Sequence, residues 1–306
     1  MKRREHEMAQ PKISVYRFMA AGCNGCDVQI LECLVPRYKL ADLGVGVVFT
    51  PEEANVLAVT GGVNVKTMEE LKSIYEKLQP PKLVVAIGNC ALTKEIFDKG
   101  YSMVGPPDAI IPVNFYISGC PPRPQAIVTS IAKALGAKLE EKEDYWATPE
   151  DYRGRHEFDS EKCIGCGACA QVCSSDAIEL IENDGKRTVK VDYGHCSYCA
   201  FCQDECPEDA IKLTREYHLV FTDRKQASVA TDVDMQKCSS CGAYFMPQRQ
   251  LKRALERTEE KVAKYKEHHD YLKETIGVCL SCRKKISNIK KAKQLLSKLS
   301  VTALQK

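Results

Sequence analysis

The feature that most constrains this chain is a cysteine motif that occurs twice, in register, 33 residues apart. The first copy reads CIGCGACAQVCSSDAIEL from Cys163, and the second reads CSYCAFCQDECPEDAIKL from Cys196. Each copy places three cysteines at CxxCxxC spacing and a fourth cysteine shortly after them. Thiolates are soft ligands, and this spacing is typical of segments that bind iron–sulfur clusters. The repeat therefore predicts a duplicated unit that holds two clusters.

In two-cluster ferredoxins, the fourth cysteine of each run binds the cluster of the other run. The repeat thus predicts an α+β two-cluster ferredoxin domain over residues 151–224. The expected ligands of the first 4Fe-4S cluster are Cys163, Cys166, Cys169 and Cys206. Those of the second are Cys196, Cys199, Cys202 and Cys173. A pair of zinc sites is the alternative, but zinc takes four ligands and rarely uses this triple spacing.

The N-terminal half alternates strand-like and helix-like segments. Strands are expected at 13–19, 45–50, 55–60, 82–87 and 109–113. Residues 66–78 and 124–135 carry apolar side chains at helical spacing. This alternation predicts an α/β domain with a parallel, flavodoxin-like sheet over residues 1–150. A polar linker is expected over residues 137–155.

Four cysteines of this domain are far apart in sequence, and each follows a predicted strand. They are Cys23, Cys26, Cys90 and Cys120. Because the carboxyl ends of parallel strands collect ligands at one edge of a sheet, these thiols are expected to meet there and to bind a single 4Fe-4S cluster. Four unrelated buried thiols are the alternative, since free cysteine packs well in protein cores.

The stretches GCNGCDVQI, IGNC and PVNFYISGCPPRPQAI carry a resemblance to a known family. Residues 13–135 resemble the small subunit of membrane-bound NiFe hydrogenases of the formate-hydrogenlyase type. That subunit is related to the quinone-proximal iron–sulfur subunit of NADH:quinone oxidoreductase. The resemblance implies that the cluster of Cys23, Cys26, Cys90 and Cys120 lies closest to a NiFe site in a partner large subunit. Gln29 departs from the family pattern, in which an acid is common at this position.

Residues 157–290 resemble the ferredoxin-like subunit of the same complexes, so the chain resembles a fusion of two adjacent subunits. The resemblance implies an electron-transfer subunit that passes electrons through three clusters to or from the NiFe centre. Its implied partners are the large subunit, membrane-embedded complex I-like or antiporter-like subunits, and a donor. The donor would be formate dehydrogenase, carbon monoxide dehydrogenase or ferredoxin. A complex I-like quinone or sulfur-compound oxidoreductase is the alternative.

Residues 225–306 contain two CxxC pairs, and a third, metal-bound module is expected there. The pairs are Cys238 with Cys241 and Cys279 with Cys282. Four thiolates fit a tetrahedral site, for which zinc is favoured over a rubredoxin-like iron or a fourth cluster. A nucleic-acid zinc ribbon is disfavoured because stacking aromatics are sparse. The lysine-rich tail after Arg283 is expected to form a helix that is solvated or packed on a partner, with a membrane-surface helix as the alternative. His268 and His269 are expected at the surface.

Charge and hydropathy bound the remaining possibilities. The net charge of +3 argues neither for nor against nucleic acid. No apolar run reaches the length of a membrane span, and the N-terminal MKRREHEMAQPK lacks the apolar core of a secretory signal. A cytoplasmic protein is expected, held at the cytoplasmic face of the membrane through its partners. Of the 17 cysteines, only Cys33 falls outside the predicted sites. No constellation predicts a catalytic residue in this chain itself.

Overall fold

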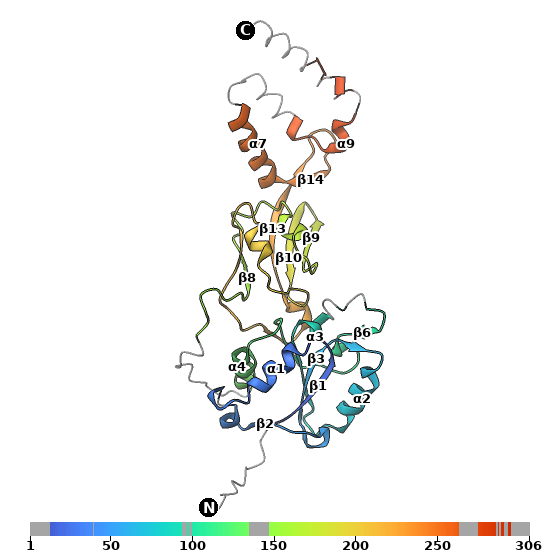
Figure 1. Ribbon diagram of the computed structural model, residues 1–306. Coiled ribbons are helices and arrows are strands. Elements are labelled where there is room, and N and C mark those ends of the chain that lie inside the picture. The colour runs from blue at the N-terminus through green and yellow to red at the C-terminus, as the bar shows by residue number, and fades with distance from the viewer. Residues whose placement is uncertain are drawn as a thin grey trace, which may run out of the picture.

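The computed structural model describes three parts that follow one another along the long axis of the molecule (Figure 1). An α/β part lies at one end, a ferredoxin-like part in the middle, and a small C-terminal part at the other end. The described residues are 13–38, 40–93, 97, 100–134, 147–262, 275–285, 287, 289–290 and 293–294. The predicted parallel α/β domain and the predicted ferredoxin-like domain are both confirmed.

A six-stranded sheet in the order β12-β7-β5-β3-β1-β2 forms the centre of the α/β part. Its parallel strands are β1 (Ile13–Ala21), β2 (Val45–Val47), β3 (Val56–Gly61), β5 (Leu83–Ile87) and β7 (Phe115–Ile117). β12 (Val220–Phe221) comes from much later in the chain and pairs antiparallel with β7. Because β1, β3, β5 and β7 share one direction, their carboxyl ends meet at the same edge of the sheet.

The expected strand over 109–113 is wrong. This stretch begins within a 3-10 helix, Pro107–Ala109, and the sheet uses β7 instead. Proline at 107 and 112 explains the difference, because proline fixes φ and has no N–H to donate to a neighbouring strand. The other four expected strands are present within a few residues of their predicted bounds.

Helices cover both faces of this sheet (Figure 1). Successive residues of β3 alternate between the faces, so Leu57 and Val59 join one core cluster while Ala58 joins another. The first cluster includes Leu71 and Ile74 of α2 (Thr67–Lys77). The second includes residues of α1 (Gly25–Glu32) and α4 (Pro124–Ala134). A small antiparallel pair, β4 (Val63–Asn64) with β6 (Met103–Gly105), flanks the sheet.

The ferredoxin-like part repeats a short unit, as the sequence predicts. Each copy has a cysteine loop, one turn of helix and a strand. The first copy contains α5 (Ala168–Gln171) and β9 (Ile178–Asn183), and the second contains α6 (Phe201–Asp204) and β11 (Ile211–Leu213). β8 (His156–Phe158) pairs with β11, and β9 forms a hairpin with β10 (Lys186–Asp192).

The strands on either side of residue 224 join different sheets. β12 extends the sheet of the α/β part, whereas β13 (Ser228–Lys237) pairs along its length with β10. β13 then continues into the C-terminal part, where it pairs with β14 (Tyr244–Pro247) and leads to α7 (Gln248–Val262). The short helix α9 (Leu280–Arg283) lies beside the turn between β13 and β14.

One apolar core continues from the α/β part into the ferredoxin-like part. Ala86, Leu92 and Tyr116 of the first part pack in the same cluster as Val189 and Ile211 of the second. A shared core fixes the two parts against each other, because its apolar surface is buried from water only while the two parts stay packed together. Among the described residues, no helix combines the length and apolarity needed to cross a membrane.

Candidate metal centres

The N-terminal cysteines lie in loops at the carboxyl edge of the α/β sheet. Cys23 follows β1, Cys26 lies in the first turn of α1, Cys90 is in α3 (Asn89–Thr93) after β5, and Cys120 follows β7. The thiols of Cys23 and Cys120 are exposed, and the other two are half-buried. The fold thus brings chain segments that each carry a thiol donor to one edge, as the sequence predicts.

Gly88 shows how closely these loops approach. A Cβ atom built on Gly88 would lie 2.2 Å from the sulfur of Cys26, and its φ of +87° is one that glycine adopts readily. Cys26 therefore occupies space that only glycine leaves open beside the Cys90 loop. A Cβ on Gly25 would lie 3.5 Å from the sulfur of Cys23 and 3.8 Å from Pro121. Such an open backbone cradle at a sheet edge fits a thiolate-bound cluster.

The two ferredoxin loops have matching backbone geometry. Gly167 and Ala200 precede α5 and α6 with φ of 81° and 74°, and Asp176 and Asp209 follow them with φ of 53° and 49°. The fourth cysteine of each run accepts an equivalent hydrogen bond. The Ala177 N–H donates to the sulfur of Cys173, and the Ala210 N–H donates to that of Cys206, each at 3.2 Å. Both copies therefore present their cysteines in the same way.

The structure brings the cysteines of the ferredoxin-like part together in two groups. One cavity is lined by Cys163, Cys166, Cys169 and Cys206 together with apolar side chains such as Val189 and Ile211. In the other group, burial foremost, together with charge repulsion from the neighbouring Cys202, Cys173 and Cys199, raises the pKa of Cys196 to about 12. Cys206 thus lies with the first run, and Cys173 with the second.

The chemistry of these groups calls for a cation. Burial raises the pKa of Cys169 to about 12 and that of Cys202 to about 11, so the thiols stay protonated at neutral pH while no cation compensates their charge. Iron supplies that compensation, and a coordinating thiol is deprotonated. Clustered, buried thiols with amide donors therefore fit iron–sulfur clusters, which would supply single-electron transfer when bound.

The two ferredoxin groups differ in their surroundings. Arginines flank the first group: Arg249 of α7 donates to the carbonyl oxygen of Cys163 at 3.3 Å, and Arg187 of β10 donates to that of Gly165 at 2.8 Å. The second group faces neutral rings. His156 Nε2 lies 3.9 Å from the sulfur of Cys196, and burial lowers the pKa of this histidine to about 4. Arg153 also donates to the Cys199 carbonyl oxygen at 2.9 Å, so arginine lies beside both groups and the ring contacts distinguish the second group.

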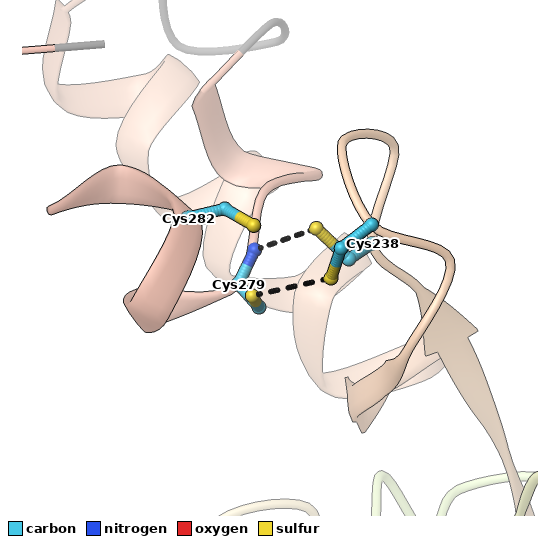
Figure 2. A group of neighbouring side chains, drawn as sticks. Cys238, Cys279 and Cys282 are labelled. Carbon is cyan, nitrogen blue, oxygen red and sulfur yellow. Dashed lines mark hydrogen bonds between the residues drawn. The ribbon is translucent and has the colours of Figure 1, made fainter. Parts of the chain in front are cut away.

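The C-terminal cysteines form a much tighter group. The sulfurs of Cys238, Cys241, Cys279 and Cys282 all lie within 4.8 Å of one another. Figure 2 shows Cys238 facing Cys279 and Cys282 from the opposite segment. In a tetrahedron with metal–sulfur bonds of about 2.3 Å, the sulfurs lie about 3.8 Å apart. The Cys241 and Cys279 sulfurs are 3.9 Å apart, so the group has the size of a site for one metal ion.

Backbone amides prepare this group for ionisation. The Cys279 N–H donates to the sulfur of Cys238 at 3.3 Å, and the Ser240 N–H donates to the same sulfur at 3.4 Å. These hydrogen bonds, that of Cys279 foremost, lower the pKa of Cys238 to about 6. The Ser239 N–H also donates to the Gly277 carbonyl oxygen at 3.0 Å and joins the two arms. The site is therefore preformed by its backbone.

Some expectations fall outside the described residues. His268 and His269, and most of the basic tail after Arg283, lie there. Sequence reasoning missed the buried His156, and it missed Asn89, whose side-chain N–H donates to the carbonyl oxygen of Cys196 at 2.5 Å. The position of Asn89 immediately before Cys90 was the available signal.

Fold and cysteine placement define the class of the protein as an iron–sulfur electron-transfer subunit of an oxidoreductase complex. Residues 23–134 match the family described as NADH ubiquinone oxidoreductase, 20 Kd subunit, and residues 157–213 match the 4Fe-4S dicluster domain. The chain belongs to the 20 kDa subunit family, with a dicluster domain fused to it. The predicted resemblance to hydrogenase and complex I subunits is confirmed, as is the general prediction of an electron-transfer subunit of such a complex.

Several relatives match the N-terminal part. The probable membrane-bound hydrogenase subunit mbhJ of Pyrococcus furiosus is 40% identical over 121 residues, which are 40% of this chain and 72% of that protein. Formate hydrogenlyase subunit 7 of Escherichia coli is 37% identical over 128 residues, 42% of this chain and 50% of that protein. A subunit of the NADH-quinone oxidoreductase of Aliarcobacter butzleri is 37% identical over 116 residues, 38% of this chain and 67% of that protein.

Among solved structures, the membrane-bound sulfane sulfur reductase, an archaeal respiratory membrane complex, contains a similar chain. It is 30% identical, with a TM-score of 0.37, and the match covers 42% of this chain and 70% of that one. The sequence relatives named above each match about two fifths of this chain.

Proposed function

We propose that this chain is the electron-transfer subunit of a membrane-bound NiFe hydrogenase complex. In this proposal it connects an electron donor to the NiFe site of a partner large subunit through three 4Fe-4S clusters. The observation that carries the proposal is the joint presence of the N-terminal cysteine edge and the duplicated ferredoxin loops on one continuous core. The CxxC spacing of Cys23 and Cys26 supports the hydrogenase side of the family, as does similarity to two hydrogenase subunits.

The proposed ligands are the three groups of cysteines predicted from the sequence. They are Cys23, Cys26, Cys90 and Cys120; Cys163, Cys166, Cys169 and Cys206; and Cys196, Cys199, Cys202 and Cys173. Asn89 donates directly to the Cys196 carbonyl oxygen, so the third group lies next to the N-terminal edge. The first ferredoxin group instead adjoins α7 through Arg249. These contacts support an order in which the second ferredoxin cluster is the neighbour of the N-terminal cluster.

The four C-terminal cysteines are proposed to bind one zinc ion. The sulfur spacing supports a single ion over a cluster, because a four-iron cube presents each thiolate at a different corner and spreads the sulfurs further apart. A structural ion suits this part, since closed four-cysteine sites contribute folding energy directly. Iron in a rubredoxin-like site has the same geometry, and metal analysis separates the two ions.

The proposed partners are the NiFe large subunit, membrane-embedded complex I-like or antiporter-like subunits, and a donor protein. The donor is formate dehydrogenase, carbon monoxide dehydrogenase or ferredoxin. In this proposal the chain lies on the cytoplasmic face of the membrane and is held there by its partners. The names of the hydrogenase and NADH-quinone oxidoreductase relatives support membrane-complex partners.

The test is metal and activity measurement on the intact complex, purified anaerobically. We expect nickel in the complex, three 4Fe-4S clusters and one zinc ion in this subunit, and hydrogen evolution from a reduced viologen. A complex without nickel that reduces quinone or a sulfur compound would overturn the hydrogenase proposal and support the complex I-like alternative. A colourless chain that contains zinc but almost no iron or sulfide would overturn electron transfer altogether.

A further inference from the structure

The second cysteine loop of the ferredoxin-like part differs from the first at a position that carries backbone strain. Gly165 and Tyr198 occupy matching places in the two runs, and both have left-handed backbone, with φ of 66° and 56°. Glycine adopts this conformation readily, whereas a bulky residue is strained there. Strained residues persist where the surrounding structure holds them. The Tyr198 side chain therefore points to a role that the first loop does not have.

Tyr198 is one end of a hydrogen-bond network between the ferredoxin-like part and the α/β part. Its hydroxyl lies 2.9 Å from Ser118 Oγ, which donates to Asn89 Oδ1, also at 2.9 Å. Asn89 Oδ1 also accepts from the Gly119 N–H at 2.7 Å, and Asn89 Nδ2 donates to the Cys196 carbonyl oxygen at 2.5 Å. Asn89 and Ser118 are 1% and 2% exposed, so water does not compete for these bonds.

Each member of this network adjoins a predicted cluster ligand. Asn89 directly precedes Cys90, Ser118 lies just before Cys120, and Tyr198 lies between Cys196 and Cys199. The network thus joins two loops of the N-terminal edge to the cysteine loop of the second repeat. A side-chain amide with both groups occupied has one orientation, because rotating it would place its N–H groups against the Gly119 N–H.

We propose that Asn89, Ser118 and Tyr198 form a clamp that holds the N-terminal cluster site and the second ferredoxin cluster site at one fixed separation. The three side chains act as positioning residues for the cysteine loops and are not ligands. The inference rests on the proposed function, because the separation matters only if both sites carry clusters. Electron exchange between bound clusters falls steeply with distance, so a rigid spacing protects its rate.

The clamp is separable from the contacts that merely hold the two parts together. Arg224 spans the same interface, with Nη1 donating to the Leu92 carbonyl oxygen at 3.1 Å and to Asp108 at 3.3 Å. Leu92 lies in α3 after Cys90, but neither acceptor is bonded to Asn89, Ser118 or Tyr198, so the loss of Arg224 leaves the network intact. The shared apolar core also remains when Tyr198 loses its hydroxyl. Arg224→Gln is therefore a matched control at the interface, and Tyr198→Phe is a mild variant that keeps the ring.

The experiment compares Asn89→Ala, Tyr198→Phe and Arg224→Gln with the wild type, as full chains loaded with iron. Amide hydrogen exchange and the EPR spectrum of the reduced clusters are measured, with iron and sulfide content. We expect exchange of the Gly119 amide to rise about a hundredfold in Asn89→Ala, which loses several buried bonds, and about fivefold in Tyr198→Phe. The magnetic interaction between the N-terminal cluster and its neighbour should change in both variants. Arg224→Gln should match the wild type in both measurements.

The outcomes separate the clamp from the proposed function. Fully loaded Tyr198→Phe and Asn89→Ala chains with wild-type exchange and wild-type magnetic interaction would overturn the clamp while leaving the three clusters in place. A wild-type chain with fewer than three clusters would overturn the proposed function, and the clamp with it. If Asn89→Ala fails to fold, Tyr198→Phe decides the matter alone. An Arg224→Gln chain that changes as much as Tyr198→Phe would reduce the network to an ordinary interface contact.

Discussion

Removal of the C-terminal metal ion should release the two arms that its four cysteines join. The perturbation is Cys279→Ser, which takes one sulfur out of the group at the start of α9. Cys241 and Cys279 are 38 residues apart in sequence. A cross-link that closes a loop of this length lowers the entropy of the unfolded segment, and treating the metal as such a link gives about 4 kcal/mol at 25 °C. The arms should therefore open far more often without the ion.

The Ser239 amide reports this opening, because its N–H donates to Gly277 across the two arms. A loss of about 4 kcal/mol corresponds to exchange up to about a thousandfold faster. The assay is hydrogen exchange of the full chain, with zinc and iron content measured in parallel. Chelator-treated wild type should match Cys279→Ser, while Ser239→Ala should keep its metal and lose only a weak side-chain bond of 3.3 Å. A variant that loses its metal but exchanges Ser239 at the wild-type rate would refute the cross-link reasoning.

Three further predictions concern other cysteines. Cys206→Ala should remove the EPR signal of the cluster assigned to the first run and Cys173→Ala that of the second; the reverse result would contradict the exchanged pairing. Gly88→Ala should lower the content of the N-terminal cluster, because the new Cβ would lie 2.2 Å from the Cys26 sulfur. Gly242→Ala is the control: Gly242 has a similar φ and no atom near its Cβ position, so this variant should keep the wild-type cluster content. Burial raises the pKa of Cys33 to about 12, so at pH 8 only about one thiol in ten thousand is ionised. Native Cys33 should therefore resist iodoacetamide until denaturant is added, as measured by mass spectrometry. Rapid alkylation of Cys33 in the native protein would contradict its burial.

The stability that Cys33 contributes should depend on pH in one direction. Its folded pKa of about 12 lies above the unfolded value of about 8.5, so the folded state holds the proton more tightly. This contribution is present below about pH 8.5 and is lost as the pH rises toward 12. Cys33→Ala should flatten the loss of stability in alkaline titrations.

The sequence predicted the parts of the fold that repeat a simple pattern. Apolar runs identified β1, β3 and β5, and helical periodicity identified α2 and α4. Duplicated cysteine spacing identified the paired loops of the ferredoxin-like part. The strand expected at 109–113 failed because the prolines at 107 and 112 outweigh the apolar residues between them. Three residues are enough for β7, and so short a strand gives almost no periodic signal.

Contacts between distant segments were beyond prediction from one sequence. Nothing in the residues around Val220 indicates that they pair with β7, because edge pairing uses backbone groups that every residue has. The orientation of Asn89 toward Cys196 depends on how the two parts pack, 107 residues apart in sequence. The cysteine positions were readable because their chemistry restricts spacing, whereas the side chains that hold the loops together are restricted only by the assembled fold.

The pairing of β12 with β7 has a consequence for any attempt to separate the fused parts. Val220 and Phe221 cover the outer edge of β7, and the Ser118 N–H donates to the Leu219 carbonyl oxygen just beyond it. A fragment cut in the linker would leave that edge bare, and bare strand edges recruit other chains. The N-terminal part therefore depends on Val220 and Phe221 to complete its sheet, and an N-terminal fragment needs a substitute strand over β7.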